Sequence, residues 1–266
     1  MGKKPHQHNQ SLDRGLRILD LYTRETHSLS AKEIADRLNV PATTLYPFLY
    51  TLVDHRYLEI DEQKRYRLGL KLLERVGEIH QVYDVRSVAR RELVTLSRTV
   101  KANARLAVLY GNDVLYLEQE EGGPQANLIL TEVVGLRVPS YCTALGKVLL
   151  ANLPDYDLDR ALDSMTLTKI TDRTITDRGA LLAELQAVRA RGYALELEEL
   201  QLGGACVAAP IRNSGSRVIA AISTSVLASR AHGKELARIA DVVMATAADI
   251  SEQLGYRHEM QEGKGR

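Results

Sequence analysis

Two short amphipathic segments, separated by a proline-containing turn and followed at once by a charged hairpin pattern, occupy residues 30–69. The first opens with Ser30-Ala31-Lys32-Glu33, a capping-box sequence whose serine oxygen and glutamate carboxylate can satisfy exposed amides at a helix start. Apolar residues then recur at helical spacing on both sides of Asn39-Val40-Pro41, which interrupts the pattern. Two short helices joined by about three residues are a helix-turn-helix.

A polar turn between two short strand patterns completes this region. Residues 57–60 and 65–68 are typical of paired strands around Asp61-Glu62-Gln63-Lys64. Upstream, an amphipathic pattern predicts a further helix that closes a small three-helix core, through Leu12, Leu16, Ile18, Leu19 and Tyr22. This order of elements predicts a winged helix-turn-helix over residues 11–69, so double-stranded DNA is the first partner to consider. A small helical domain with no DNA-binding role is the alternative.

Further motifs follow in order along the chain: residues 11–19 (SLDRGLRIL), 66–69 (YRLG), 138–147 (VPSYCTALGK) and 206–211 (CVAAPI). Together with the capping-box helix they closely resemble the IclR family of bacterial transcription regulators, from about Gln10 to Tyr256. The resemblance implies a homodimer joined through its DNA-binding halves, and often a tetramer formed as a dimer of dimers. A dimer with two-fold symmetry of this kind is expected to bind a pseudo-palindromic operator.

The length of 266 residues suits two domains. Residues 1–10 are polar and predict a mobile arm, and residues 257–266 a disordered tail. Residues 70–84 predict an amphipathic linker helix, with Leu72, Leu73, Val76 and Ile79 as a plausible intersubunit face. Because no Gly/Ser-rich stretch separates the halves, the connection is expected to be rigid.

Residues 85–256 predict an α+β domain with a largely antiparallel sheet, which the resemblance identifies as a GAF-like effector-binding domain. Gly111-Asn112-Asp113 between two apolar runs is typical of a hairpin. The expected strands are 105–110, 114–118, 127–134, 193–197, 206–211 and 218–226, and the expected helices are 85–100, 143–152, 177–191 and 234–254.

Composition excludes several classes of protein. No apolar run is long enough to span a bilayer and no secretion leader is present, which favours the cytoplasm and no membrane partner. Cys142 and Cys206 lie far apart without C-x-x-C spacing, so we expect reduced thiols and no metal site. No cofactor motif occurs either. Residues 1–83 hold 13 Lys or Arg against 11 Asp or Glu, so the placement of charge must matter more than its total.

The predicted recognition helix lacks the two basic side chains that the family usually carries there, and it contains Pro47. A proline inside a helix removes a backbone donor and clashes with the preceding turn, at a cost of about 3 kcal/mol. Either the helix begins at Pro41 and kinks near Pro47, which the family analogy favours, or Thr43 or Thr44 is the N-cap and Pro47 lies in the first turn.

In both cases base reading falls on Thr43, Thr44 and Tyr46, whose hydroxyls and methyl groups cannot form the bidentate contact that selects guanine. Packing of Tyr46 against the first helix is the alternative role for that side chain. Cations on helix ends and on the wing are expected to contact phosphates, namely Arg14, Lys32, Arg65 and Arg67.

A helix start at Thr143-Ala144-Leu145-Gly146-Lys147, directly after an extended segment ending at Pro139, predicts a carboxylate site, since free amides and the helix dipole favour an anion there. The resemblance places other effector-binding residues around it: Glu196, Cys206, Ser223 and Ser225 as polar contacts, and Leu130 and Val138 as apolar walls. Ser223 and Ser225 share one face of a strand. They could instead satisfy nearby backbone, and Cys206 could be a plain buried hydrophobe.

A small organic acid is therefore the expected effector. By the resemblance, Asn127 and Gly204 stand where some relatives carry bulkier apolar residues, and Gly203-Gly204 leaves extra room, which would admit a larger acid such as an aromatic carboxylate. Two other functions are alternatives: an enzyme that uses Glu196, Glu198, Glu199, His232 or Cys206, or a protein-interaction module. No catalytic motif such as G-x-S-x-G, a Walker loop or H-E-x-x-H occurs, so no catalytic residue is expected.

Overall fold

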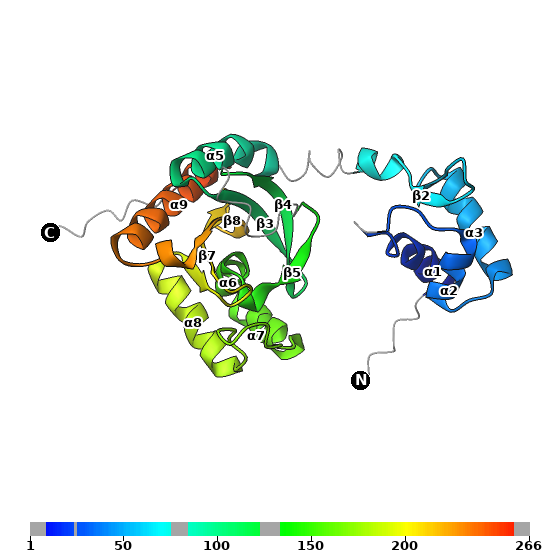
Figure 1. Ribbon diagram of the computed structural model, residues 1–266. Coiled ribbons are helices and arrows are strands. Elements are labelled where there is room, and N and C mark those ends of the chain that lie inside the picture. Colours follow the sequence, from blue (N-terminus) through cyan, green and yellow to red (C-terminus); the bar gives the residue numbers. More distant parts are fainter. Residues whose placement is uncertain (1–8, 24–25, 76–84, 123–133, 258–266) are drawn as a thin grey trace. The chain divides into compact units, whose positions relative to one another are not determined.

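The computed structural model describes residues 9–23, 26–75, 85–122 and 134–257, and the chain divides into two compact units between Tyr83 and Asp84 (Figure 1). The first unit contains α1 (Gln10–Leu19), α2 (Ala31–Leu38), α3 (Ala42–Asp54), β1 (Leu58–Ile60) and β2 (Tyr66–Leu68). The predicted winged helix-turn-helix is confirmed. Residues 1–8 of the expected arm and 258–266 of the expected tail lie outside the described residues.

The capping box begins α2 as predicted. The Ser30 side chain accepts a hydrogen bond from the Glu33 amide at 3.3 Å, and Glu33 Oε2 accepts one from the Ser30 amide at 2.7 Å. Asn39 ends the helix in the left-handed conformation, with φ of 54°. Of the two predicted starts of α3, the structure shows the first. Pro41 is the N-cap, and Pro47 lies inside the helix. Pro47 is exposed, so water can reach the carbonyl that its missing amide would have served.

One prediction about the core of this unit is wrong. Leu12 and Leu16, expected to close the three-helix core, are 63% and 53% exposed. Ile18 is the α1 residue that is fully buried, against Ile34, Leu45 and other side chains of α2, α3 and the wing. Periodicity locates an apolar stripe on a helix, but it does not say which neighbour covers that stripe.

The wing is a two-stranded antiparallel sheet in which Leu58 lies opposite Leu68 and Ile60 opposite Tyr66. On the side of β2 away from β1, Tyr66 also forms an antiparallel bridge with Leu29. After the wing, residues 71–75 are helical, whereas residues 76–84 of the predicted linker, including Val76 and Ile79, lie outside the described residues.

The second unit is built on a six-stranded antiparallel sheet in the order β5-β4-β3-β8-β7-β6 (Figure 1). Its strands are β3 (Asn103–Tyr110), β4 (Asp113–Glu120), β5 (Arg137–Pro139), β6 (Ala194–Leu197), β7 (Gly204–Arg212) and β8 (Val218–Leu227). Its helices are α5 (Val85–Val100), α6 (Ala144–Ala151), α7 (Asp155–Ser164), α8 (Arg178–Arg191) and α9 (Gly233–Gln253), with short 3-10 turns η2 (Ser140–Cys142) and η3 (Ala228–Arg230).

The sheet has a hydrophobic cluster on each face. Side chains of α5 and α9 pack on one face, and those of α6, α7 and α8 on the other. The predicted hairpin, the later strands and the long helices are all present. One strand and one helix were not among those expected. The short strand β5 was described only as an extended segment ending at Pro139, and α7 was missed because only Leu158 and Leu162 are buried in this otherwise charged segment. Residues 127–133 of the expected strand 127–134 lie outside the described residues, and no described helix is long and apolar enough to cross a bilayer.

Candidate functional site

The outer surface of α3 presents the three side chains expected to read bases. Thr43, Thr44 and Tyr46 are all exposed. The Tyr46 ring stacks on that of Tyr50, one turn later, with centroids 6.1 Å apart and planes 27° apart. Tyr46 therefore has a ring partner on its own helix. Tyr50, which is 64% exposed, was missed by the sequence analysis, although its spacing of four from Tyr46 places both on one helix face.

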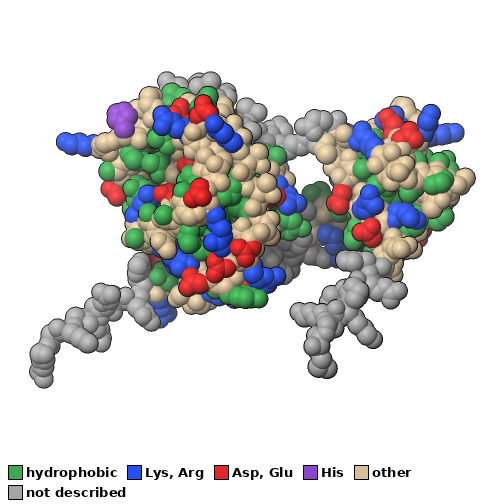
Figure 2. All heavy atoms as spheres, turned by 90° about the horizontal axis from the view of Figure 1, so that it is seen from below, with side chains coloured by type: hydrophobic (Ala, Val, Ile, Leu, Met, Phe, Trp, Pro, Cys, Tyr) green, Lys and Arg blue, Asp and Glu red, His purple; other side chains and the backbone are tan. Residues whose placement is uncertain are grey.

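The cations expected at phosphates differ in how they are held. Lys32 is exposed at the start of α2. Arg14 lies 5.4 Å from the centre of the Phe48 ring, close enough for a cation–π contact. Arg67 pairs with Glu59 at 3.0 Å across the wing and stays 56% exposed. Charge is mixed on the visible surface of each unit, where Figure 2 shows basic and acidic side chains interspersed.

Arg65 is tied into its own domain. Its Nε donates to Ser28 Oγ at 3.0 Å, and a terminal nitrogen lies 2.9 Å from Glu33 Oε2. Hydrogen bonds from Ser30, and then from Arg65, hold the pKa of Glu33 at about 2. Arg65 thus joins the wing to the capped start of α2, a role that its place in the sequence did not indicate.

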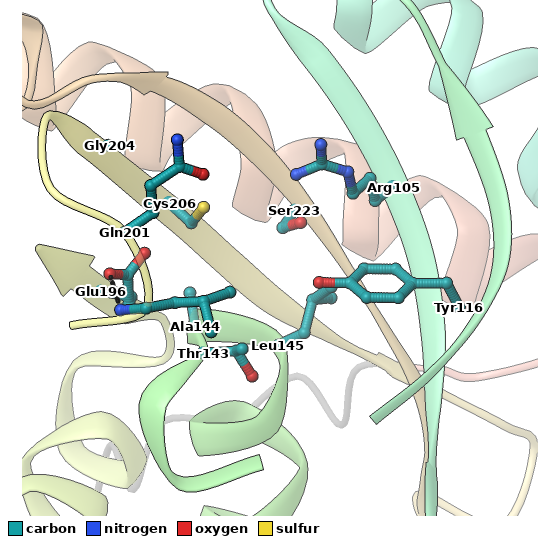
Figure 3. Close-up of a pocket in the computed structure, with 11 residues that line it drawn as sticks. Arg105, Tyr116, Thr143, Ala144, Leu145, Glu196, Gln201, Gly204, Cys206 and Ser223 are labelled. Atoms are coloured by element: carbon teal, nitrogen blue, oxygen red, sulfur yellow. Dashed lines mark hydrogen bonds between the residues drawn. The ribbon is translucent and has the colours of Figure 1, made fainter. Parts of the chain in front are cut away.

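In the second unit, residues from the sheet and from the start of α6 enclose a pocket (Figure 3). The space open to the centre of a water molecule is about 20 Å³. The lining consists of Arg105, Tyr116, Thr143, Ala144, Leu145, Glu196, Leu200, Gln201, Gly204, Cys206 and Ser223. Six of the nine expected effector-binding residues therefore meet at one cavity.

The remaining three lie elsewhere. Ser225 lies next to the lining, hydrogen-bonded to Arg105 and 3.1 Å from Cys206 Sγ. Val138 is half-buried in the cluster that packs around α6, outside the lining. Leu130 lies outside the described residues.

The start of α6 differs in one detail from the prediction. The 3-10 turn η2 separates Pro139 from the helix, so α6 begins at Ala144 with Thr143 as its N-cap. Thr143 Oγ1 accepts a hydrogen bond from the Gly146 amide at 3.0 Å. Because this cap serves the third residue of the helix, the first two amides remain directed at the pocket end of α6.

The sequence analysis missed four pocket residues: Leu200 and Gln201 between β6 and β7, Arg105 on β3 and Tyr116 on β4. The guanidinium of Arg105 lies 5.9 Å from the centre of the Tyr116 ring, and the arginine is 2% exposed. Its Nε donates to Gln119 Oε1 at 2.9 Å and a terminal nitrogen donates to Ser225 Oγ at 2.6 Å. The signal was a single charged residue inside the apolar strand pattern, where burial of a charge requires partners.

Burial also sets the protonation of the pocket's acids. It raises the pKa of Glu196, against the opposing hydrogen bonds from the amides of Leu200 and Glu199. It raises the pKa of Cys206 and that of Cys142 to about 12, so both thiols are protonated near neutral pH. A protonated, buried thiol is a poor nucleophile. His232 is exposed at the start of α9, outside the pocket lining, and the described residues contain no cluster suited to a metal ion.

Comparison with known proteins gives matches over nearly the whole chain. Residues 11–62 match the model of the IclR helix-turn-helix domain, and residues 78–252 match that of the C-terminal domain of bacterial IclR transcriptional regulators. The chain is 38% identical over 248 residues to the HTH-type transcriptional regulator XynR of Escherichia coli, covering 93% of this chain and 98% of XynR.

Two solved structures are also similar. The IclR protein of Thermotoga maritima has 29% identity and a TM-score of 0.74, covering 94% of this chain and all of the other. An IclR homologue of Microbacterium hydrocarbonoxydans, complexed with 4-hydroxybenzoate, has 26% identity and a TM-score of 0.82, covering 92% of this chain and 99% of the other.

Proposed function

The chain belongs to the IclR family of bacterial transcriptional regulators, and we propose that its winged helix-turn-helix binds a pseudo-palindromic operator under the control of a small organic acid. The observation that carries this proposal is the presence of an exposed α3 face in one unit and, in the other, a pocket whose mainly apolar lining includes Arg105 and Glu196. In this proposal the protein works in the cytoplasm, without a cofactor, as a binding protein and not as an enzyme. The regulators among its relatives and the protonated thiol of Cys206 in the pocket support that view.

Base recognition is assigned to Thr43, Thr44 and Tyr46, with phosphate contacts from Arg14, Lys32 and Arg67. Arg65 belongs to this set only if its contact with Ser28 and Glu33 opens on DNA. Hydroxyls and methyl groups make single contacts, so few direct guanine contacts are expected from α3. Discrimination by α3 should then depend on a few uncharged side chains.

Replacing Thr44 or Tyr46 with alanine is expected to lower affinity for the selected operator by about 5- to 150-fold, the range of about 1–3 kcal/mol for one base position. Affinity for unrelated DNA and the salt dependence should change little, because no phosphate-binding charge is removed. The operator would be selected from a random duplex library, and binding measured by fluorescence anisotropy between 50 and 200 mM salt.

A matched Lys32→Ala variant should show the reverse, a smaller salt slope with discrimination retained. If both α3 variants discriminate as the wild type does, the assignment of base reading to these residues is wrong. If the wild type selects no sequence at all, the proposed regulator function itself fails.

We assign the homodimer contact to an apolar groove between α1 and α3 of the first unit. Its lining includes Leu12, Leu16, Leu19, Phe48 and Leu52, and its volume is about 540 Å³. Leu12 and Leu16 are more than half exposed, an unfavourable state for adjacent leucines unless a partner covers them. A second copy is the occupant that a two-fold operator requires, since it presents the same groove to its partner.

Replacing Leu16 with glutamate is expected to weaken dimerisation at least about 10-fold, because it puts a charge into the apolar contact. Analytical ultracentrifugation across a concentration series would measure the change, with operator affinity falling in parallel. Asp13→Glu, on the same helix and outside the groove lining, is the matched control. An unchanged dimer constant in L16E would exclude this groove as the subunit contact.

The expected aromatic carboxylate requires the effector pocket to open. A cavity that holds benzene has a volume of about 150 Å³, whereas about 20 Å³ is open here. Leu200 and Gln201 line the pocket from the segment between β6 and β7, which ends at Gly203 with φ of 79°. We infer that this segment moves outward for an aromatic acid. The 4-hydroxybenzoate in the Microbacterium hydrocarbonoxydans homologue supports an effector of that size.

Effector control requires the acid to bind more tightly to one of two conformations that differ in operator affinity. We assign the coupling to the linker at residues 70–84, of which residues 71–75 are helical. An acid that binds without changing operator affinity would contradict this part of the proposal.

A further inference from the structure

A buried cation forms one end of the effector pocket. Arg105 lines the pocket from β3, and Figure 3 shows its guanidinium above Ser223, directed toward the side of Gln201 and Cys206. It is oriented by Gln119 Oε1 on the neighbouring strand and by Ser225 Oγ. A guanidinium carries five N–H donors in a planar fork that matches a carboxylate. This end of the pocket therefore carries a positive charge suited to an anion, on a guanidinium whose Nε and one terminal nitrogen are held by Gln119 and Ser225.

A buried acid forms the other end. Glu196, 3% exposed, extends from β6, and its Oε1 accepts hydrogen bonds from the amides of Glu199 at 2.6 Å and Leu200 at 3.2 Å. These two bonds fix the carboxyl group at the edge of the pocket, on the opposite side from Arg105 in Figure 3. A ligand that reaches Glu196 meets a carboxyl oxygen, which suits a hydrogen-bond donor and disfavours a second anion.

Sheet register joins the two ends by a polar row. Glu196 lies opposite Cys206, and Cys206 opposite Ser225 on the adjacent strand. Along this row Ser225 Oγ lies 3.1 Å from Cys206 Sγ and accepts from Arg105 at 2.6 Å. Tyr116, Ala144 and Leu145 supply the less polar walls. The pocket thus runs from a positive end to an acidic end over a short polar floor.

We infer that Arg105 binds the effector's carboxylate while Glu196 accepts a hydrogen bond from a hydroxyl at the other end of the same molecule, so the effector is a hydroxy acid. This inference rests on the proposed effector function of the pocket and adds a residue and a ligand class to it. Arg105 is the anchor, Gln119 positions it, and Glu196 is the residue that distinguishes hydroxy acids from simple acids.

The alternative anion site, the start of α6, is electrostatically less favourable. Burial raises the pKa of Cys142, two residues before α6; Glu196 and Glu199 add to the rise and Lys147 opposes it. Glu199 is paired with Lys147, so Glu196 is the acidic group that a carboxylate bound at α6 would face in the pocket, where the helix start offers a partial positive charge of only about half a unit. Arg105 carries a full positive charge.

The experiment is a calorimetric series on the full chain with three matched probes: 4-hydroxybenzoate, benzoate, which lacks the hydroxyl, and 4-hydroxybenzamide, which lacks the charge. In a second series 3-hydroxypropionate, propionate and 3-hydroxypropionamide serve the case of an aliphatic effector. In whichever series contains a hydroxy acid that binds, this acid should bind about 10- to 100-fold more tightly than its amide, as expected for hydrogen bonds to a charged group.

Arg105→Met should weaken hydroxy acid binding by about the same 10- to 100-fold and leave amide binding nearly unchanged. Arg105→Lys keeps the charge without the planar fork of donors. Its affinity for the hydroxy acid should lie between those of wild type and Arg105→Met. Glu196→Gln should reduce the preference for the hydroxy acid over the simple acid. Arg86→Met is the matched control, because Arg86 pairs with Glu118 outside the pocket lining and its loss should not affect acid binding.

Hydroxy acid affinity that survives in Arg105→Met, with the variant folded by circular dichroism, would overturn the anchor. Equal losses of acid and amide would show that Arg105 only maintains the pocket's shape. No binding of either hydroxy acid at 10 mM would overturn the ligand class. Operator binding by wild-type protein without any acid is measured in parallel, so a failure of the regulator function is distinguished from a failure of the anchor.

Discussion

Replacing Lys147 with methionine is expected to lower the free energy of unfolding of the effector domain by about 3–5 kcal/mol, the usual effect of removing one partner from a buried ion pair. Lys147 is 1% exposed in the middle of α6, and its Nζ lies 2.5 Å from Glu199 Oε1. Leu195 O accepts a second hydrogen bond at 3.4 Å, and Glu184 lies 3.9 Å away. Methionine fills the same space and leaves the Glu199 carboxylate without its cation.

The deficit in K147M should grow with pH. Burial raises the pKa of Glu199, and Lys147 acts against this rise. Without Lys147 the folded-state pKa rises further above the unfolded value of about 4.3. A carboxyl group with a raised folded pKa keeps its full stability at low pH and loses it as pH rises through that pKa. Urea unfolding followed by circular dichroism at pH 5 and pH 8 should therefore give the larger difference from wild type at pH 8.

The matched control is the double variant Lys147→Met, Glu199→Leu, which replaces both charges with apolar groups. It should recover most of the stability lost in K147M, because no unpaired charge remains buried. If K147M unfolds within about 0.5 kcal/mol of wild type at pH 8, or if the double variant is no more stable than K147M, the pair does not behave as a buried ion pair.

The same ion pair holds the pocket's outer segment. The Glu199 amide donates to Glu196, and the carbonyl of Glu199 accepts from Thr174 Oγ1 at 2.7 Å. Lys147 therefore positions the segment that contributes Leu200 and Gln201 to the pocket. A destabilised variant should bind acids more weakly as well, through the segment and not through direct contact.

Much of the fold could be predicted because its signals are local. The capping box at Ser30 and Glu33 lies within one turn of helix, and the hairpin at Gly111 within one turn of chain. Pro47 could not be placed locally, since a helix that tolerates it depends on exposure of the carbonyl one turn earlier. Features set by residues close in sequence could be predicted. Features set by contacts between distant residues could not.

The site shows the same division. Thr143, Glu196 and Cys206 were expected near one another through resemblance, and the structure brings them to one cavity. Arg105 was missed because its partner Ser225 is 120 residues away and meets it only through the register of β3 and β8. Arg65 was expected to face DNA because no local feature reveals its contact with Ser28, 37 residues earlier. Charged residues acquire their roles from partners that only the tertiary structure supplies.

Replacing Gly146 with alanine is expected to destabilise the effector domain by about 3 kcal/mol or more, the upper range for overpacking a core. A Cβ at this position would lie 2.1 Å from the carbonyl oxygen of Ser140 and 2.4 Å from its Cα. These are backbone atoms of η2, so no side-chain rotation can relieve the clash. The third position of α6 must therefore lack a side chain for η2 to pack against it.

The clash at Gly146 would also change the effector pocket. The Gly146 amide donates to Thr143 Oγ1, and Thr143, Ala144 and Leu145 line the cavity, so a displaced helix start moves that part of the lining. Thermal unfolding and acid titration of G146A should both show losses. Gly179→Ala, in the exposed first turn of α8, is the matched control, because its Cβ would meet only the Asp177 side chain at 3.2 Å. That variant should be neutral or more stable by up to about 1 kcal/mol. A Gly146→Ala protein as stable as wild type would mean that α6 and η2 are less closely packed than this contact requires.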